Sequence, residues 1–211
     1  VILGSGRWMA FQAKARPIGV AAVILVAFAA FVPTRLVTWP MTGWQFVACD
    51  VGQGDGLVLR TESDHAVVVD VGLDPTLIDG CLSRLRVTQV DALILTHYHA
   101  DHVDGLPGAL RGRTVHQILV TPVAEPAYQV QQVREQAAVA GIPIATLYAG
   151  DLLRFGDTAW RVWWPVREIH EGSIPNNGSL VVTVEKGDFR ALLLADVERE
   201  GARELLEELA V

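Results

Sequence analysis

Apolar residues beyond Trp44 come in short runs, and most of these runs are closed by glycine, proline or a charged residue. Runs of this kind predict strands. One of them, "DALILT", is apolar throughout its centre, which is typical of a strand covered on both faces. We expect strands within 44–50, 56–60, 65–70, 91–96, 116–120, 151–156, 160–165, 179–187 and 189–196.

Apolar positions three and four residues apart predict helices between these strands. The clearest cases are residues 75–86, a glutamine-rich stretch at 128–140 and an amphipathic stretch at 197–210. A further helix is expected to begin near His102 or Asp104. Strands interleaved with helices favour sheets inside and helices outside, an α/β architecture.

An uncharged apolar run, "PIGVAAVILVAFAAFVP", spans residues 17–33. Its length is near the lower limit for a transmembrane helix, which is our interpretation; a signal-peptide core or a buried soluble helix are the alternatives. If this run spans the membrane by itself, the larger number of basic residues before it than after it puts the rest of the chain outside the cytoplasm. The expected organisation is a juxtamembrane segment (1–16), a transmembrane helix (17–33), a linker (34–43) and one domain (44–211).

The composition narrows the classes of partner only slightly. The 211 residues carry a formal net charge of −7 and are 51% hydrophobic, with a mean hydropathy of +0.31. Such a chain lacks the basic excess that usually marks non-specific nucleic-acid binding, although bound metal can supply positive charge locally. We interpret Cys49 and Cys81 as two buried free thiols rather than a disulfide.

The segment "LILTHYHADHVDG" (93–105) is the strongest chemical signal. On extended backbone, His97 and His99 point the same way and could hold one ion. Asp101 and His102 come from the following bend and could face a second ion. Imidazole suits zinc, and carboxylate also admits manganese. We therefore predict a site for two divalent ions, Zn²⁺ or Mn²⁺.

Two aspartates occupy the same kind of position, at the point where an apolar strand runs out. Asp70 ends "AVVVD" and Asp196 ends "ALLLAD". Functional groups gather at the carboxyl ends of parallel strands. Asp196 could instead cap the last helix, but an isolated carboxylate at a strand end is costly, so we favour a metal role.

These motifs carry a family resemblance. "HYHADH" matches the HxHxDH motif of the metallo-β-lactamase superfamily, and "DVGQGDG" (50–56), "NNGSLVV" (176–182) and "LLLADVE" (192–198) resemble the hydrolase-like domain of the ComEC competence family, the DNA-internalisation channel of transformation. The resemblance implies an αββα sandwich with its metal site between two sheets. It also leads us to expect a domain incomplete at its C-terminus, and Asn176 and Asn177 stand where the superfamily usually has a histidine.

The resemblance also implies roles for individual residues. His97 and His99 would bind the first ion, Asp101 and His102 the second, and Asp196 would bridge them. Asp101 would also orient the attacking water. We expect supporting or substrate contacts from Asp50, Gln53, Asp55, Asp70, Asn177 and Ser179, although "DVGQGDG" and "NNGS" also read as plain turns.

The resemblance further implies a function and a setting. The domain would be a metal-dependent nuclease that cleaves DNA, the strand that is not imported, beside the channel of a multi-pass cell-membrane protein. Its partners would be single-stranded DNA, the membrane, the rest of its own channel chain and other DNA-uptake proteins, and the domain would face outward. The alternatives are a small-molecule hydrolase acting on a lactam, thioester or lactone, and a non-catalytic module that guides DNA.

Overall fold

The computed structural model describes residues 19, 21, 25–27, 39–167 and 170–209. The chain divides into two compact units, residues 1–42 and 43–211. The expected transmembrane helix at 17–33 lies largely outside the described residues, so it stays a prediction. Within the described part of the chain, no helix is long and apolar enough to cross a membrane.

The second unit is built on two sheets. In the described residues the larger sheet has seven strands in the order β1-β2-β3-β4-β6-β7, with β5 pairing β4. Strands β1 to β3 are antiparallel, whereas β3, β4, β6 and β7 run parallel. The strands are β1 (Phe46–Ala48), β2 (Leu57–Arg60), β3 (His65–Val69), β4 (Gln89–Leu95), β5 (Thr114–Val115), β6 (Ile118–Val120) and β7 (Ile144–Thr146).

The smaller sheet is antiparallel, with the order β11-β10-β9-β8 among the described residues. Its strands are β8 (Leu152–Phe155), β9 (Thr158–Trp164), β10 (Val181–Lys186) and β11 (Phe189–Leu193). All the strands expected from the apolar runs are therefore present, and the glutamine-rich stretch is a helix as predicted.

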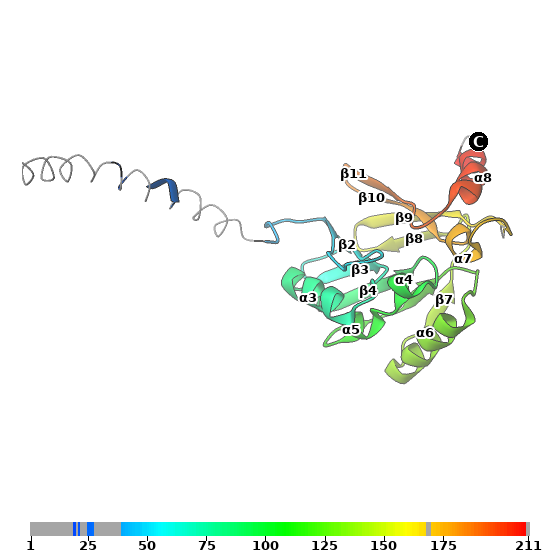
Figure 1. Ribbon diagram of the computed structural model, residues 1–211, viewed down its shortest axis with the longest axis horizontal. Helices are drawn as coiled ribbons and strands as arrows, with labels where there is room; N and C mark the ends of the chain where they lie inside the picture. Colours follow the sequence, from blue (N-terminus) through cyan, green and yellow to red (C-terminus); the bar gives the residue numbers. More distant parts are fainter. Residues whose placement is uncertain (1–18, 20, 22–24, 28–38, 168–169, 210–211) are drawn as a thin grey trace, which may run out of the picture. The chain divides into compact units, whose positions relative to one another are not determined.

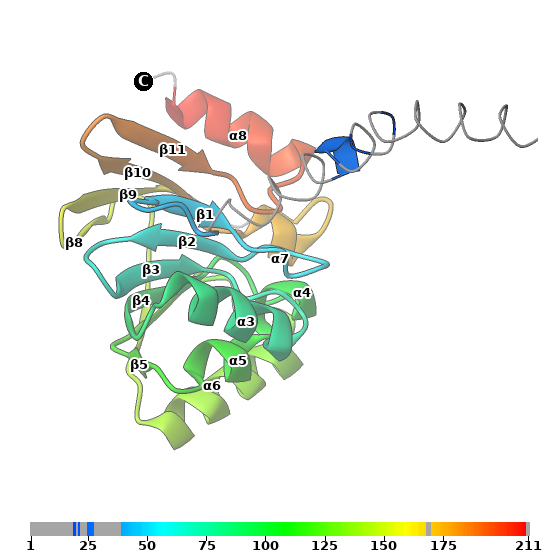
Figure 2. The same cartoon turned by 90° about the vertical axis from the view of Figure 1, so that its left-hand side faces the viewer.

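Helices cover the outer side of each sheet (Figures 1 and 2). The helices are α3 (Pro75–Leu85), α4 (Ala100–Val103), α5 (Leu106–Leu110), α6 (Ala127–Ala140), α7 (Ile174–Asn177) and α8 (Arg199–Leu209). Helices α3 to α6 pack on the larger sheet, and α8 lies against β9 of the smaller one. This is the layered α/β arrangement that the sequence predicts.

Strand β4 shows why the centre of "DALILT" is wholly apolar. Leu93 and Leu95 pack into the core under the helices, whereas Ala92 and Ile94 pack into the core between the two sheets. Successive side chains of a strand point to opposite faces, so a strand buried on both faces needs apolar residues throughout. Trp160 of β9 is also buried in the core between the sheets.

The helix expected to begin near His102 or Asp104 is instead two short helices, α4 and α5. The break falls at Gly105, whose N–H donates to the carbonyl of Gly72 (2.9 Å). A Cβ at Gly105 would lie 2.0 Å from the carbonyl oxygen of Val71. The chain therefore bends where its backbone meets the end of β3, and helix α4 begins earlier than predicted, at Ala100.

The two cysteines form a disulfide, so the prediction of free thiols is wrong. Cys49 follows β1, and Cys81 lies on the buried face of α3 beside Ile78 and Leu82. Their Cα atoms are 5.9 Å apart, within the range that a disulfide spans. The bond ties the segment after β1 to helix α3.

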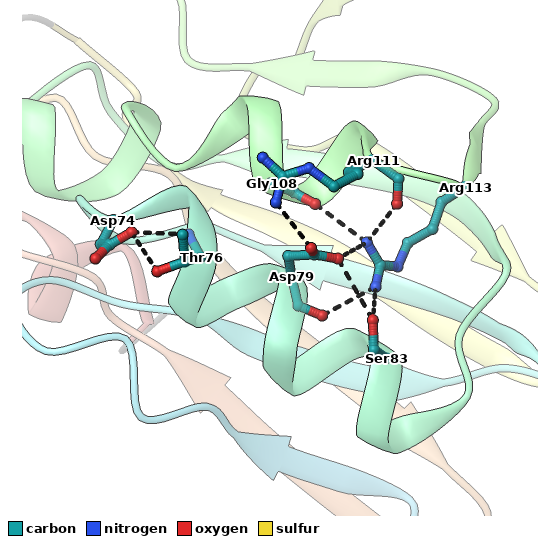
Figure 3. A network of polar contacts seen from close by, with 7 residues as sticks. All are labelled: Asp74, Thr76, Asp79, Ser83, Gly108, Arg111 and Arg113. Carbon is teal, nitrogen blue, oxygen red and sulfur yellow. Dashed lines mark hydrogen bonds and ion pairs between the residues drawn. The ribbon is translucent and has the colours of Figure 1, made fainter.

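A polar network holds α3 against the segment after α5 (Figure 3). The guanidinium of Arg113 donates to the carboxylate of Asp79 (2.9 Å) and to the hydroxyl of Ser83 (2.7 Å). Arg111 donates to the other oxygen of Asp79 (3.0 Å). The hydrogen bond from Arg113, with a smaller contribution from Arg111, lowers the pKa of Asp79.

Candidate metal centre

The parallel pairing of β3 and β4 places the two polar strand ends side by side. Val69 pairs with Ile94, and the backbone N–H of Asp70 donates to the Ile94 carbonyl (2.9 Å). Asp70 follows β3 directly, and His97 follows β4 after one residue, Thr96. The smaller sheet joins at the same edge, because the N–H of Leu180 donates to the Thr96 carbonyl (2.9 Å).

Asp70 anchors His102 from behind. One carboxylate oxygen accepts from the Thr96 N–H (2.8 Å), and the other accepts from the Thr96 hydroxyl (2.7 Å) and contacts Nδ1 of His102 (2.9 Å). Both oxygens of this buried carboxylate are therefore in use. The sequence analysis missed Thr96, although its place between the apolar run and "HYHADH" is a usable signal.

Because Nδ1 of His102 contacts Asp70, only Nε2 is available to bind a metal ion. The residue is fully buried, and its Nε2 has no hydrogen-bond partner among the described residues. The nearest acidic group is Asp196, whose Oδ1 lies 3.5 Å from Nε2. A buried nitrogen without a partner is costly unless something binds it. The carboxylate on Nδ1 and the open Nε2 are the arrangement that metal-binding histidines commonly have.

The other histidines complete a compact donor group. His97 is buried, and its Nε2 lies 3.2 Å from Nδ1 of His99. The rings of His97 and His102 have centroids 4.1 Å apart. His97, His102 and Asp196 each bring one ligand atom to within 4.8 Å of the others. Two imidazoles and a carboxylate at this spacing fit a divalent ion such as Zn²⁺ or Mn²⁺.

The surroundings of the donor group shift the pKa values of His97 and His102 in opposite directions. Burial, reinforced by the charges of His102 and His99, lowers the pKa of His97 to about 2, so its imidazole is neutral. Burial also disfavours a charged His102, but the hydrogen bond and charge of Asp70, with Asp196 and Asp101, raise its pKa to about 9. Without a bound ion, the surrounding carboxylates therefore keep a positive charge on His102, whereas His97 is neutral.

The "DVGQGDG" loop lies against the same group. Nε2 of Gln53 donates to Oδ2 of Asp101 (3.0 Å). Asp55, Asp70 and His102 form a second set with ligand atoms within 4.8 Å of one another. Asp50, in contrast, is exposed and belongs to neither set. Asp101 also belongs to neither, so the two-ion ligand assignment stays a prediction.

The "NNGS" segment is buried beside the start of α8. Asn177 is fully buried: its Nδ2 donates to the Glu171 carbonyl (2.9 Å), and its Oδ1 accepts from the N–H groups of Glu198 and Gly201 (both 3.1 Å). These bonds join α7 to the start of α8, because helix ends need partners for their free backbone groups. Ser179 is also fully buried. The Oγ of Ser179 has no hydrogen-bond partner among the described residues. Supporting or substrate contacts from Asn177 and Ser179 stay a prediction.

Two packed sheets, with imidazoles and carboxylates converging where strands of both sheets end, define a domain of the metallohydrolase type. The sequence profile of the Metallo-beta-lactamase superfamily matches residues 49–208. The chain therefore belongs to the metallo-β-lactamase superfamily of hydrolases.

Curated relatives include two proteins with different names. ComE operon protein 3 of Bacillus subtilis is 28% identical over 178 residues, which is 74% of this chain and 22% of that protein. Hydroxyacylglutathione hydrolase of Photobacterium profundum is 32% identical over 120 residues, covering 50% of this chain and 46% of that protein. The chain thus spans less than half the length of either relative.

A solved structure supports the fold alone. MEM-A1, a subclass B3 metallo-beta-lactamase isolated from a soil metagenome library, superposes with a TM-score of 0.50 at 12% sequence identity. The alignment covers 79% of this chain and 71% of that one.

Proposed function

We propose that this chain carries the hydrolase domain of a membrane DNA-uptake protein of the ComEC type, and that the domain cleaves phosphodiester bonds in the DNA strand that is not imported. One observation carries the hydrolytic part: the fully buried His102 is fixed by Asp70, its Nε2 lacks a hydrogen-bond partner among the described residues, and it lies beside His97 and Asp196. Such a donor group suits divalent ions, Zn²⁺ or Mn²⁺, which we infer to be two in number.

The choice of DNA rests on similarity. ComE operon protein 3 is 28% identical over 74% of this chain, and the motifs "DVGQGDG" and "NNGSLVV" resemble the ComEC competence family. The net charge of −7 does not favour DNA by itself. Divalent ions would offset part of that charge at the site, where the phosphodiester would lie.

The setting that we propose is the outer side of a cell membrane. The apolar run at 17–33 would anchor the domain to the membrane and to the rest of its channel. The Cys49–Cys81 disulfide supports an outward orientation, because disulfides persist in oxidising compartments and are rare in the cytosol. Single-stranded DNA and other DNA-uptake proteins are the proposed partners.

Each polar side chain of the site has a specific task in this proposal. His97, His102 and Asp196 hold the ions, together with His99 and Asp101 as the family motif implies. Asp70 fixes the ring of His102 through Nδ1 (2.9 Å), and Gln53 fixes the carboxylate of Asp101 (3.0 Å), which orients the attacking water. When bound, divalent ions lower the pKa of water and neutralise charge that develops on phosphate oxygens.

One competing function has an observation in its favour. The relative from Photobacterium profundum is named as a hydroxyacylglutathione hydrolase and is 32% identical over half of this chain. A small-molecule hydrolase would use the same donor group on a thioester carbonyl. A substrate panel separates the two functions.

The test incubates the full 211-residue chain, loaded with Mn²⁺ or Zn²⁺, with end-labelled single-stranded DNA and, separately, with a hydroxyacylglutathione thioester. We expect metal-dependent DNA cleavage that Asp101→Ala lowers by about a hundredfold or more. Thioester hydrolysis without DNA cleavage would replace the nuclease with the small-molecule enzyme. DNA binding without turnover of either substrate would favour a guiding module.

A further inference from the structure

The side of the smaller sheet that points away from the larger sheet has a chemistry of its own. Residues that pair across neighbouring strands point to the same face of a sheet. From β8 to β11, one row across this outer face is Leu152, Arg161, Thr183 and Leu192. The next row is Arg154, Ala159, Glu185 and Arg190. The opposite face, with Trp160 and Val182, is buried in the core between the sheets.

Helix α8 packs against only one end of this outer face. There Leu205 joins a small buried cluster, against which Trp163 packs. Beyond that end, Leu152 is 74% exposed and Leu192 is 43% exposed. The charged side chains of the two rows, Arg154, Arg161, Glu185 and Arg190, are exposed as well. Apolar and basic side chains grouped on one exposed face are typical of an interaction surface.

The charge of this face is opposite to that of the whole chain. Glu185 lies 3.4 Å from Arg190 and offsets its charge in part. Arg154 and Arg161 form no ion pair with any described residue. In a chain with a net charge of −7 this is a local excess of positive charge, and such an excess attracts an anionic partner.

One of the arginines is held in a fixed orientation. The guanidinium carbon of Arg161 lies 3.9 Å from the centre of the Trp163 ring, and Nε1 of that ring donates to the Thr183 hydroxyl (3.0 Å). A guanidinium stacked on an aromatic ring keeps its other face for a ligand. Planar guanidinium groups stack on nucleic-acid bases and bind phosphates. A lipid surface offers the phosphates but no flat ring, so the stack favours nucleic acid.

The outer face ends at the edge where the metal centre lies. Strand β11 contains Arg190 and Leu192, and Asp196 of the donor set follows soon after its end. The six residues from Arg190 to Asp196 span at most about 20 Å. A nucleic-acid strand lying along this face would therefore have its next nucleotides at the metal centre.

From these contacts we propose that the outer face of the smaller sheet binds single-stranded DNA and delivers it to the metal centre. We call this surface the arginine face, and it consists of Leu152, Arg154, Arg161, Trp163, Arg190 and Leu192. The choice of DNA as the nucleic acid rests on the proposed function. The surface itself rests on the arginines, on the Arg161–Trp163 stack and on the exposed leucines.

The test measures binding of fluorescein-labelled oligothymidylate to the full chain by fluorescence anisotropy, with a chelator present so that no cleavage occurs. We expect the triple variant Arg154→Gln/Arg161→Gln/Arg190→Gln to bind about tenfold more weakly or worse. The slope of log affinity against log salt concentration should fall by about 2, because three phosphate contacts are lost.

A matched pair of single variants checks that position, and not total charge, decides. Arg161→Gln should weaken binding by about threefold. Arg134→Gln removes the same charge from an exposed position on α6, and it should bind like the wild type. Arg161→Lys keeps the charge but not the planar stack, so it should bind more weakly with nearly the salt slope of the wild type.

The proposal is overturned if the wild type does not bind the oligonucleotide at low salt, or if the triple variant binds it as tightly as the wild type. If the triple variant keeps DNA binding but loses its preference for phosphatidylglycerol vesicles over phosphatidylcholine vesicles, the face is a membrane surface instead. The nuclease is judged separately, by cleavage with Mn²⁺ or Zn²⁺. Arginine-dependent binding without cleavage would reject the nuclease and keep the arginine face, whereas cleavage with arginine-independent binding would do the reverse.

Discussion

Reduction of the Cys49–Cys81 disulfide should destabilise the domain by a measurable amount. The bond closes a loop with a sequence separation of 32 residues. In the chain-entropy description, opening a loop of this length costs about 4 kcal/mol of folding free energy at 25 °C. For a domain of this size the urea dependence of the unfolding free energy is about 2 kcal/mol per molar. The urea midpoint should therefore fall by about 2 M.

The assay is urea unfolding followed by tryptophan fluorescence, with and without a phosphine reductant, in the presence of a chelator so that metal binding does not contribute. The double variant Cys49→Ser/Cys81→Ser is the control, and its midpoint should not respond to the reductant. The reasoning is refuted if reductant leaves the wild-type midpoint in place, or if the untreated protein reacts as two free thiols.

Three further effects follow from particular contacts. Gly54→Ala should cost about 2 kcal/mol of stability, seen as a lower urea midpoint, because its Cβ would lie 1.7 Å from the Asp101 carbonyl oxygen. Asp79→Asn should lower stability by a similar amount, about 2 kcal/mol, since Arg113 is almost fully buried. The lowered pKa of Asp79 stabilises the fold above its unfolded pKa of about 4, and this stabilisation disappears as the pH falls through the folded pKa. Equal urea midpoints for Asp79→Asn and wild type near pH 7 would contradict both the predicted stability loss and the predicted pH dependence.

Much of the fold could be predicted because burial imposes periodicity on the sequence. The centre of β4 is apolar at every position since it is covered on both faces, and polar side chains appear where it ends. The motif that follows places His97, His99 and His102 within six positions, so their rings lie near one another in any compact turn. Local patterns of this kind are visible in one sequence.

Other features depend on contacts between distant segments. Cys49 and Cys81 become neighbours only because β1 ends beside the inner face of α3, and neither residue's surroundings reveal this pairing. Within "DVGQGDG", Asp50 is exposed whereas Asp55 reaches the donor set. That difference arises from left-handed glycines and the contact with Asp101, which the residue types alone do not specify.

The hydrogen bonds of the "NNGS" segment also depend on distant residues. Asn177 has the chemistry to contact a substrate, but the ends of α7 and α8 need the same donors and acceptors. The partners of the Asn177 side chain are set by where the chain places Glu171 and Glu198. The contacts of Glu198 with Ser173 and Asn176 likewise have no signal in the sequence.

The most direct test of the central claim, that the polar strand ends form a divalent-metal site, is anomalous X-ray diffraction at the manganese edge from crystals of the Mn²⁺-loaded protein. We predict an anomalous peak within bonding distance of Nε2 of His102, with His97 and Asp196 around it. Stoichiometrically bound Mn²⁺ whose anomalous peaks all lie away from His102 would contradict the metal site and the hydrolytic function built on it.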